Sequence, residues 1–191
     1  MPTNRHVINE TIAAYANAAI DAANAAGGRE AVVEVRNQMI QVLDAMAANI
    51  TLRISLDEEG YTSEQREELV KNVFQGLNPI MIELLTVMAS RCDIALLRKV
   101  YLAYEELIES KLNFNVIDVT TVVDLDDNLR SVITKKAESD LGRDCVLVEH
   151  IDTNIMGGVI MSTKDRYVDA SVRSQLDRAR IVLKEKDGGE C

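Results

Sequence analysis

Over the first hundred residues, apolar positions recur at steps of three or four, which is the spacing of a helix face. Residues 8–26 and 32–46 each carry such a stripe, and Gly27 and Gly28 between them predict a break. Residues 52–56 alternate apolar with polar side chains, so they predict either a short strand or an extended connector. The chain is therefore predicted to begin with helices.

Three more helices are predicted before residue 112. Thr62 and Gln65 have the spacing of a capping box, so a third helix is expected to begin near Ser63 with its inward residues at Leu69, Val70, Val73 and Phe74. Asn78 and Pro79 fit the cap and first position of a fourth helix. That helix is apolar around nearly its whole circumference, which predicts the most buried helix of a bundle. Asp93 is the predicted cap of a fifth helix, which is expected to run to about Lys111 and to join two halves of the chain.

After Asn113 the apolar period changes from that of a helix to that of a strand. Strands are predicted at residues 116–125, 145–150, 155–162 and 166–168, with a helix between the first two that is capped near Asp126 and stopped by Gly142. A last helix is expected from about residue 170, with Asp169 as its cap. The predicted fold class is mainly α: a helical bundle at 1–110, a small α+β domain at 111–183 and a polar tail at 184–191.

Composition narrows the classes of function. The chain has 191 residues, a net charge of −10 and only 4% aromatic residues, which disfavours binding to nucleic acid. The longest stretches without Asp, Glu, Lys or Arg are 11 residues, whereas a spanning helix needs about 20 apolar residues, so no direct membrane insertion is expected. The start of the chain lacks the pattern of an export signal. Three cysteines without a C-x-x-C pair fit reduced thiols.

Residues capable of catalysis or cofactor binding are few. No phosphate-binding glycine motif occurs, and Gly157 and Gly158 are predicted to form a bulge or to permit a close backbone approach. His6 and His150 are the only histidines, and strand alternation places Cys145 and His150 on opposite faces, which disfavours a metal site. Cys92, before a helix cap, is the weak case for a reactive thiol. No catalytic residue, cofactor or metal ligand is therefore predicted.

The helical stripes leave two interpretations open. They form either the core of the bundle or a shallow groove into which the amphipathic helix of a partner docks.

Two segments carry a resemblance to a known family. Residues 148–161, followed by 165–173 and Leu176, have the order strand, Gly-Gly, strand, turn and Asp-x-Ser-Val helix start. Near the other end, residues 12–19 contain a Tyr-Ala helix, and Arg91 is followed by Leu96, Leu97 and Tyr101. In these features the chain resembles the delta subunit of F-type ATP synthase, which is similar to the mitochondrial oligomycin-sensitivity-conferring protein.

The resemblance implies a non-catalytic stator subunit at the cytoplasmic face of the cell membrane. In this role the helical domain binds N-terminal helices of alpha subunits on the alpha/beta head, and the C-terminal domain holds the b subunits of the peripheral stalk, so that rotation is coupled to ATP synthesis. The resemblance also places the alpha-subunit helix between the first and fifth helices. We expect the stripe residues there to contact that helix: Ile12, Tyr15, Ala19, Tyr101 and Tyr104. The alternatives are a helical adaptor unconnected with ATP synthase and, less favoured, a small cytosolic enzyme that uses Cys92 or the region of His150.

Overall fold

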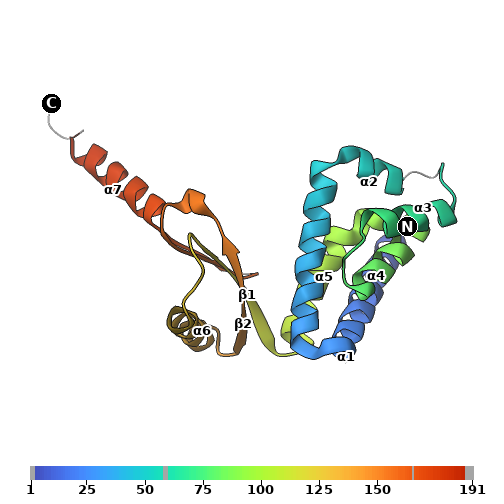
Figure 1. Cartoon of the computed structure of the whole chain (residues 1–191), viewed down its shortest axis with the longest axis horizontal. Coiled ribbons are helices and arrows are strands. Elements are labelled where there is room, and N and C mark those ends of the chain that lie inside the picture. Colours follow the sequence, from blue (N-terminus) through green and yellow to red (C-terminus); the bar gives the residue numbers. More distant parts are fainter. Residues whose placement is uncertain (1–2, 58–59, 165, 188–191) are drawn as a thin grey trace. The chain divides into compact units, whose positions relative to one another are not determined.

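The computed structural model describes residues 3–57, 60–164 and 166–187. The chain divides into two compact units, Met1–Leu112 and Asn113–Cys191. The first unit is built from helices and the second from a sheet with helices, so the predicted fold class, mainly α with a small α+β domain, is confirmed (Figure 1).

In the first unit, α1 (Thr3–Ala48) is interrupted where the sequence predicts a break. Gly27 and Gly28 have non-helical backbone angles, and Gly28 has a φ of 62° and a ψ of −142°, a conformation that side chains with a Cβ disfavour. The next segment corrects the expectation, because residues 52–56 lie in a helix, α2 (Ile50–Asp57), rather than in a strand or connector. Leu52 and Leu56 are one helical turn apart, and Leu56 is buried, so the same residues also satisfy a helical pattern.

The caps of α3 (Ser63–Val73) and α4 (Pro79–Ser90) are confirmed. Thr62 and Gln65 form a reciprocal capping box, and the Asn78 side chain accepts from the Ile80 amide with Pro79 in the first helical turn. Two burial predictions are wrong, because Val73 on α3 and Val87 on α4 are exposed. Helix α4 therefore buries one side rather than its whole circumference.

A 3-10 turn, η1 (Ile94–Leu96), precedes α5 (Leu97–Lys111). Asp93 stands at the predicted cap position, but its side chain makes no capping hydrogen bond. Instead its carboxylate accepts a hydrogen bond from the Tyr15 hydroxyl on α1, at 2.8 Å. A tertiary contact thus replaces the local cap. The core of the unit is largely aliphatic and methionine-rich, and its fully buried side chains include Ile20, Met39, Leu56, Met81, Leu85, Met88 and Leu97.

The second unit is a four-stranded sheet in the order β2-β1-β3-β4. Its strands are β1 (Phe114–Thr121), β2 (Asp144–Ile151), β3 (Gly158–Ser162) and β4 (Tyr167–Ser171). β1 pairs in parallel with β2 through the crossover helix α6 (Asp127–Leu141) and antiparallel with β3, which pairs antiparallel with β4. Gly142 ends α6 in the left-handed region, as predicted. The small core joins β1 to α6 through Ile117, Val119, Leu125, Ile133 and Ala137.

The last part of the chain differs from the expectation in three places. A short turn, η2 (Thr153–Ile155), occupies the predicted start of the third strand, and the fourth strand continues to Ser171. Helix α7 (Val172–Asp187) therefore begins later, and Ser171 rather than Asp169 accepts from its first turn, at the Ser174 amide. The helix also continues to Asp187, so the expected tail does not begin at residue 184; residues 188–191 lie outside the described residues.

Candidate docking surfaces

The structure brings four of the five predicted partner-binding residues into the interior of the first unit. Ile12, Tyr15, Ala19 and Tyr104 are all buried, and Tyr104 has no exposed surface. The Tyr104 hydroxyl donates to the Val32 carbonyl on the second half of α1, at 3.1 Å. Burial raises the pKa of Tyr104 above its ordinary value. For Tyr15, burial and then the hydrogen bond to Asp93 raise the pKa. Both hydroxyl groups therefore make hydrogen bonds inside the first unit.

Tyr101 is the one half-buried member of that set, and it faces the second half of α1. Its hydroxyl donates to the carboxylate of Glu105, which also accepts from Arg36 on α1, with Arg36 Nη2 at 2.9 Å. The Arg36 side chain is only 4% exposed and that of Glu105 12%, so this is a buried ion pair between α1 and α5. Sequence reasoning did not identify it. A signal existed, because Arg36 shares a helix face with Val32 and Met39, where a charge requires a partner.

From Ala13 to Ala26 the exposed surface of α1 is made mostly of alanines. Ala14 and Ala18 are exposed and lie on the face opposite the buried Ala16, Ala19 and Ala23. Close by, Lys111 at the end of α5 bonds Asp21 of α1 at 3.1 Å, which ties the two helices together at their surface. Small side chains let another helix backbone approach closely, so this face can accept a helix.

In the second unit, Gly157 and Gly158 lie where the chain enters β3. Gly158 has a φ of 84°, and a Cβ there would stand 2.4 Å from the Ala170 carbonyl oxygen of β4. Val172 at the start of α7 donates its amide to the Gly157 carbonyl at 2.9 Å. The pair therefore sets the approach of β3 to β4 and the departure of α7.

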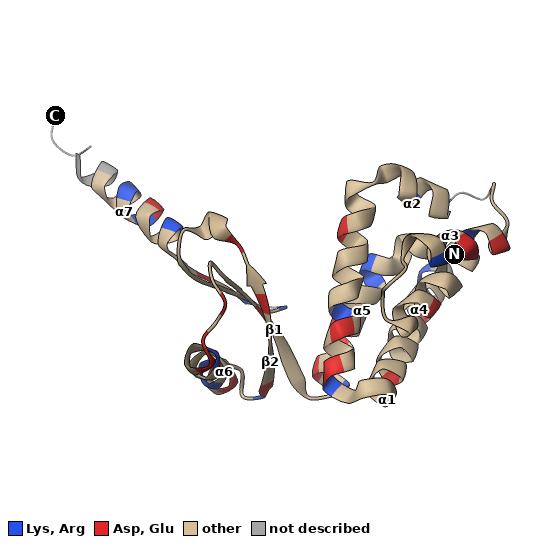
Figure 2. Ribbon diagram, viewed as in Figure 1, with Lys and Arg blue, Asp and Glu red and all other residues tan. Residues whose placement is uncertain are grey.

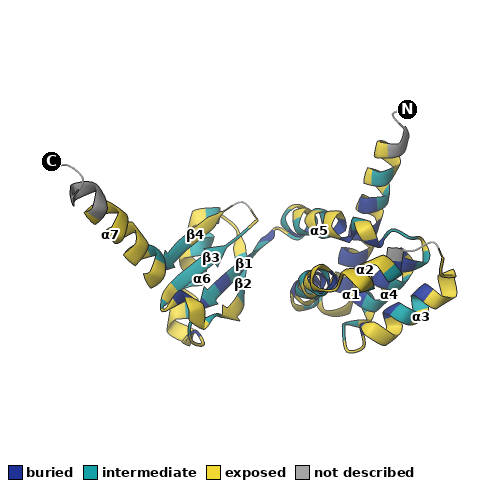
Figure 3. Cartoon of the chain, turned by 90° about the horizontal axis from the view of Figure 1, so that it is seen from above, coloured by how far each residue is buried: buried dark blue, intermediate teal, exposed yellow. Residues whose placement is uncertain are grey.

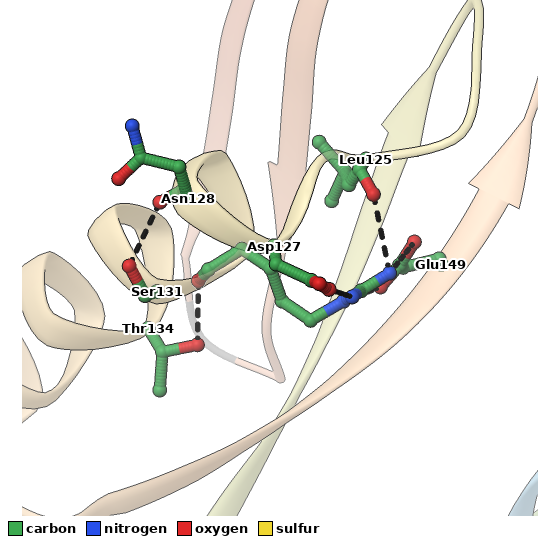
Figure 4. Close-up of polar contacts among 7 residues, drawn as sticks. Leu125, Asp127, Asn128, Ser131, Thr134 and Glu149 are labelled. Atoms are coloured by element: carbon green, nitrogen blue, oxygen red, sulfur yellow. Dashed lines mark hydrogen bonds and ion pairs between the residues drawn. The ribbon is translucent and has the colours of Figure 1, made fainter.

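A polar cluster joins α6 to the edge strand β2 (Figure 4). The Arg130 guanidinium donates to both carboxylate oxygens of Glu149, with the longer contact at 3.2 Å, and also contacts Asp127 and the Leu125 carbonyl. The hydrogen bond from Arg130 lowers the pKa of Glu149. This fork holds the start of the helix against the sheet.

We predict that Arg130→Gln returns the pKa of Glu149 toward its ordinary value of 4.5. Because the folded pKa lies below the unfolded one, the contact stabilises the unit above the unfolded value, and that contribution is lost as the pH falls through the folded pKa. Carboxyl titration by NMR checks this, with Lys135→Gln on exposed α6 surface as the control. An unchanged Glu149 titration in Arg130→Gln would contradict the assignment.

The cysteine and histidine candidates do not come together. His150 Nε2 lies 3.2 Å from Asp118 on the neighbouring strand, whereas the Cys145 thiol donates to the Arg143 carbonyl and packs against the small core. Burial, with Glu138 and Asp144 nearby, raises the pKa of the Cys145 thiol. Across residues 3–57, 60–164 and 166–187, no group of three His, Cys, Asp or Glu side chains is placed to hold a metal ion.

In that same described part, no single helix has both the length and the apolar composition to cross a membrane. One pair, Arg5–Ala48 with Ile50–Leu56, passes that test together but is bent by 107°.

Helix α7 is exposed along most of its length (Figure 3), and it has the largest set of exposed large apolar residues among the described elements of the second unit. Leu176 is 58% exposed, Leu183 64% and Ile181 57%. The element against which α7 packs most is β4. On the side of α7 next to the sheet, Ser174, Asp177, Arg178 and Ile181 line an open hollow of about 330 Å³ together with Asp152 and Asp169.

Two compact units, each with an exposed helix face, are typical of a protein that works as part of a larger assembly. The comparisons with known proteins agree with that class. The family model described as ATP synthase delta (OSCP) subunit matches residues 12–183. The chain therefore belongs to the ATP synthase delta (OSCP) subunit family, as the sequence features indicated, and is a structural subunit and a peripheral part of the F-type ATP synthase.

Similar proteins cover most of the chain. An ATP synthase subunit delta of Rhodopirellula baltica is 30% identical over 165 residues, which are 86% of this chain and 72% of the relative. One of Synechococcus elongatus is 31% identical over 140 residues, 72% of this chain and 78% of the relative. Among solved structures, a chain of the Toxoplasma gondii mitochondrial ATP synthase hexamer has a TM-score of 0.50 and 17% identity, covering 90% of this chain and 96% of that one, which supports the fold alone.

Proposed function

We propose that this delta subunit is the stator link between the alpha/beta catalytic head and the b subunits of the peripheral stalk. In this proposal the first unit holds the head by binding N-terminal helices of alpha subunits, and the second unit holds the stalk. The observation that carries the proposal is the division into two units, each with its own core and its own exposed apolar or small-residue helix face. Once one unit is bound, attachment of the other becomes effectively intramolecular, which strengthens the tether.

The place proposed for the alpha-subunit helix is the outer surface of the first half of α1 beside α5. The burial of Ile12, Tyr15, Ala19 and Tyr104 supports an indirect role for these residues, because they hold the two helices together beneath that surface. A charged substitution at Tyr15 or Tyr104 would therefore destabilise the bundle itself, and its effect on peptide binding could not be separated from that loss of stability. Exposed positions are the better probes.

We expect Ala14→Arg and Ala18→Arg to weaken binding of an alpha-subunit N-terminal peptide about tenfold or more, about 1.4 kcal/mol each. The bulky charge would prevent close approach of the peptide helix. Calorimetric titration measures the affinity, and circular dichroism shows that the bundle is folded. Ala47→Arg, at an exposed position near the other end of α1, is the matched control. Equal affinity in all three folded variants would place the site elsewhere, and no binding by the wild type would count against the head half of the proposal.

We also propose that the subunit supplies no catalytic residue of its own and lies at the cytoplasmic face of the cell membrane within the complex. The raised pKa of the Cys145 thiol argues against a nucleophile in the region of His150, because a nucleophilic cysteine needs a lowered pKa. His150 contacts Asp118 on the neighbouring strand, and the Cys145 thiol donates to the Arg143 carbonyl instead. This arrangement further supports the proposal that the region of His150 supplies no catalytic residue.

A further inference from the structure

Four exposed apolar residues of α7 form a narrow seam, whereas the exposed Ile181 and Val182 lie off it. Val172, Leu176, Ala179 and Leu183 follow one another at steps of four, three and four, which is the spacing of the contact positions of a coiled coil. All four are exposed. Of the α7 residues that line the hollow beside the sheet, Ser174, Asp177, Arg178 and Ile181 lie on the opposite face of the helix, and Arg173 lies between the two faces. From Leu176 to Leu183 the seam therefore lies opposite the hollow, whereas the Val172 side chain lies beside Gly157 of the same unit.

Packing against its own unit stabilises α7 little along this apolar face. Most helical stability in proteins comes from packing of the apolar face rather than from the propensity of the helix itself. In α7 that face is in solvent. A partner that covers the seam would therefore also stabilise the helix.

The charges beside the seam indicate the chemistry of that partner. From Val172 to Leu183 the helix carries three arginines and one aspartate, a net charge of +2 in a chain whose total is −10 (Figure 2). Arg173 and Arg180 are exposed and stand seven residues apart along one edge of the seam, and Arg173 also lines the hollow. Positions of this kind form the ion pairs that select partner and orientation in paired helices. They match a helix with acidic residues beside its own apolar stripe.

Two other occupants fit less well. A second copy of α7 would bring the two arginines together in an antiparallel pair, and in a parallel pair Arg180 would meet the neutral Gln175. An anionic membrane surface usually takes helices with Trp, Phe or Leu on a broad apolar face and a basic polar face. Here the seam is narrow, it lacks aromatic residues, and Asp177 lies on the polar face.

We propose that α7 is the docking helix for a stalk segment whose apolar stripe is flanked by Asp or Glu. The proposal rests on the proposed attachment of the second unit to the b subunits, and it specifies the surface and the chemistry of that attachment.

The experiment titrates the full chain with a purified soluble fragment of the b subunit. We expect Leu176→Asp and Leu183→Asp each to weaken binding at least tenfold, while Ile181→Asp, an equal change at an equally exposed position on the opposite face, leaves binding within about twofold. Arg180→Glu should weaken binding more than Arg178→Glu, which makes the same change of charge across the helix. Melting curves establish that every variant is folded.

Two designed peptides with the same apolar seam, one with Glu and one with Lys at the flanking positions, test the charge directly. We expect the Glu peptide to bind at least tenfold more tightly at low salt, to lose that advantage at 1 M salt because of screening, and to raise the helix content of the chain. Equal affinity for the two peptides, self-association through the seam, or binding to anionic vesicles that Leu176→Asp abolishes would overturn the proposed partner.

The failure of this inference differs from the failure of the proposed function. If the b fragment binds wild type and Leu176→Asp equally, α7 is not the docking helix, although the stator role stands. If the b fragment does not bind the wild type, the stalk half of the proposed function fails, and the inference fails with it.

Discussion

Gly158→Val is expected to unfold the second unit at a temperature far below that of the wild type. A valine there would place its Cβ 2.4 Å from the Ala170 carbonyl oxygen and 2.9 Å from the Ser171 Cα, at a φ of 84°. Backbone strain and overpacking together would cost about 3 kcal/mol or more. The separation of β3 from β4 would also disturb the Gly157 contact with the start of α7.

A matched variant separates strain from collision. Gly142→Val also places a valine at positive φ, 69°, but its Cβ would meet no other part of the described structure within 4 Å beyond its immediate chain neighbours. We therefore expect a loss of about 1–2 kcal/mol for Gly142→Val, from strain alone. Calorimetric melting measures both variants, and Gly158→Val should also lose binding to the b fragment while it keeps binding to the alpha peptide. Equal destabilisation by the two variants would show that the close approach to β4 is not limiting.

Glu105→Leu is expected to destabilise the first unit by about 3 kcal/mol, because it removes the carboxylate that neutralises the buried charge of Arg36. The same change also takes away the acceptor of the Tyr101 hydroxyl. The loss should appear as a lower midpoint of urea unfolding with an unchanged slope.

Two comparisons test the role of the ion pair itself. Glu106→Leu, at the next and exposed position of α5, should change stability by no more than about 0.5 kcal/mol. In the double variant Arg36→Met with Glu105→Leu, most of the lost stability should return, because neither charge of this ion pair is then present. A double variant as unstable as Glu105→Leu would mean that packing rather than charge dominates at this site.

Elements with local signals could be predicted from the sequence. The capping box of Thr62 and Gln65, the Asn78-Pro79 start and the Gly142 stop each depend on residues within one helical turn, so their geometry follows from the sequence directly. The prediction for residues 52–56 is wrong because Leu52 and Leu56 fit both the strand period and the helix period.

Features that depend on distant partners could not be predicted in this way. Asp93 has the sequence of a cap, but its carboxylate is bound by Tyr15, 78 residues away. Tyr15 and Tyr104 have the same periodic pattern whether they line a groove or a core, and the structure places them in the core. Conversely, the stripe of α7 resembles a core stripe but is exposed, because periodicity reveals an apolar face without revealing which chain covers it.

The most direct test of the stator role is the set of proteins that stays with the tagged chain when it is purified from detergent-solubilised membranes. The account predicts that alpha, beta and b subunits co-purify with the wild type. It further predicts that the purified Gly158→Val chain binds the alpha peptide but fails to bind the isolated b fragment. Recovery of the wild-type chain alone, or with a different set of partners, would contradict the account.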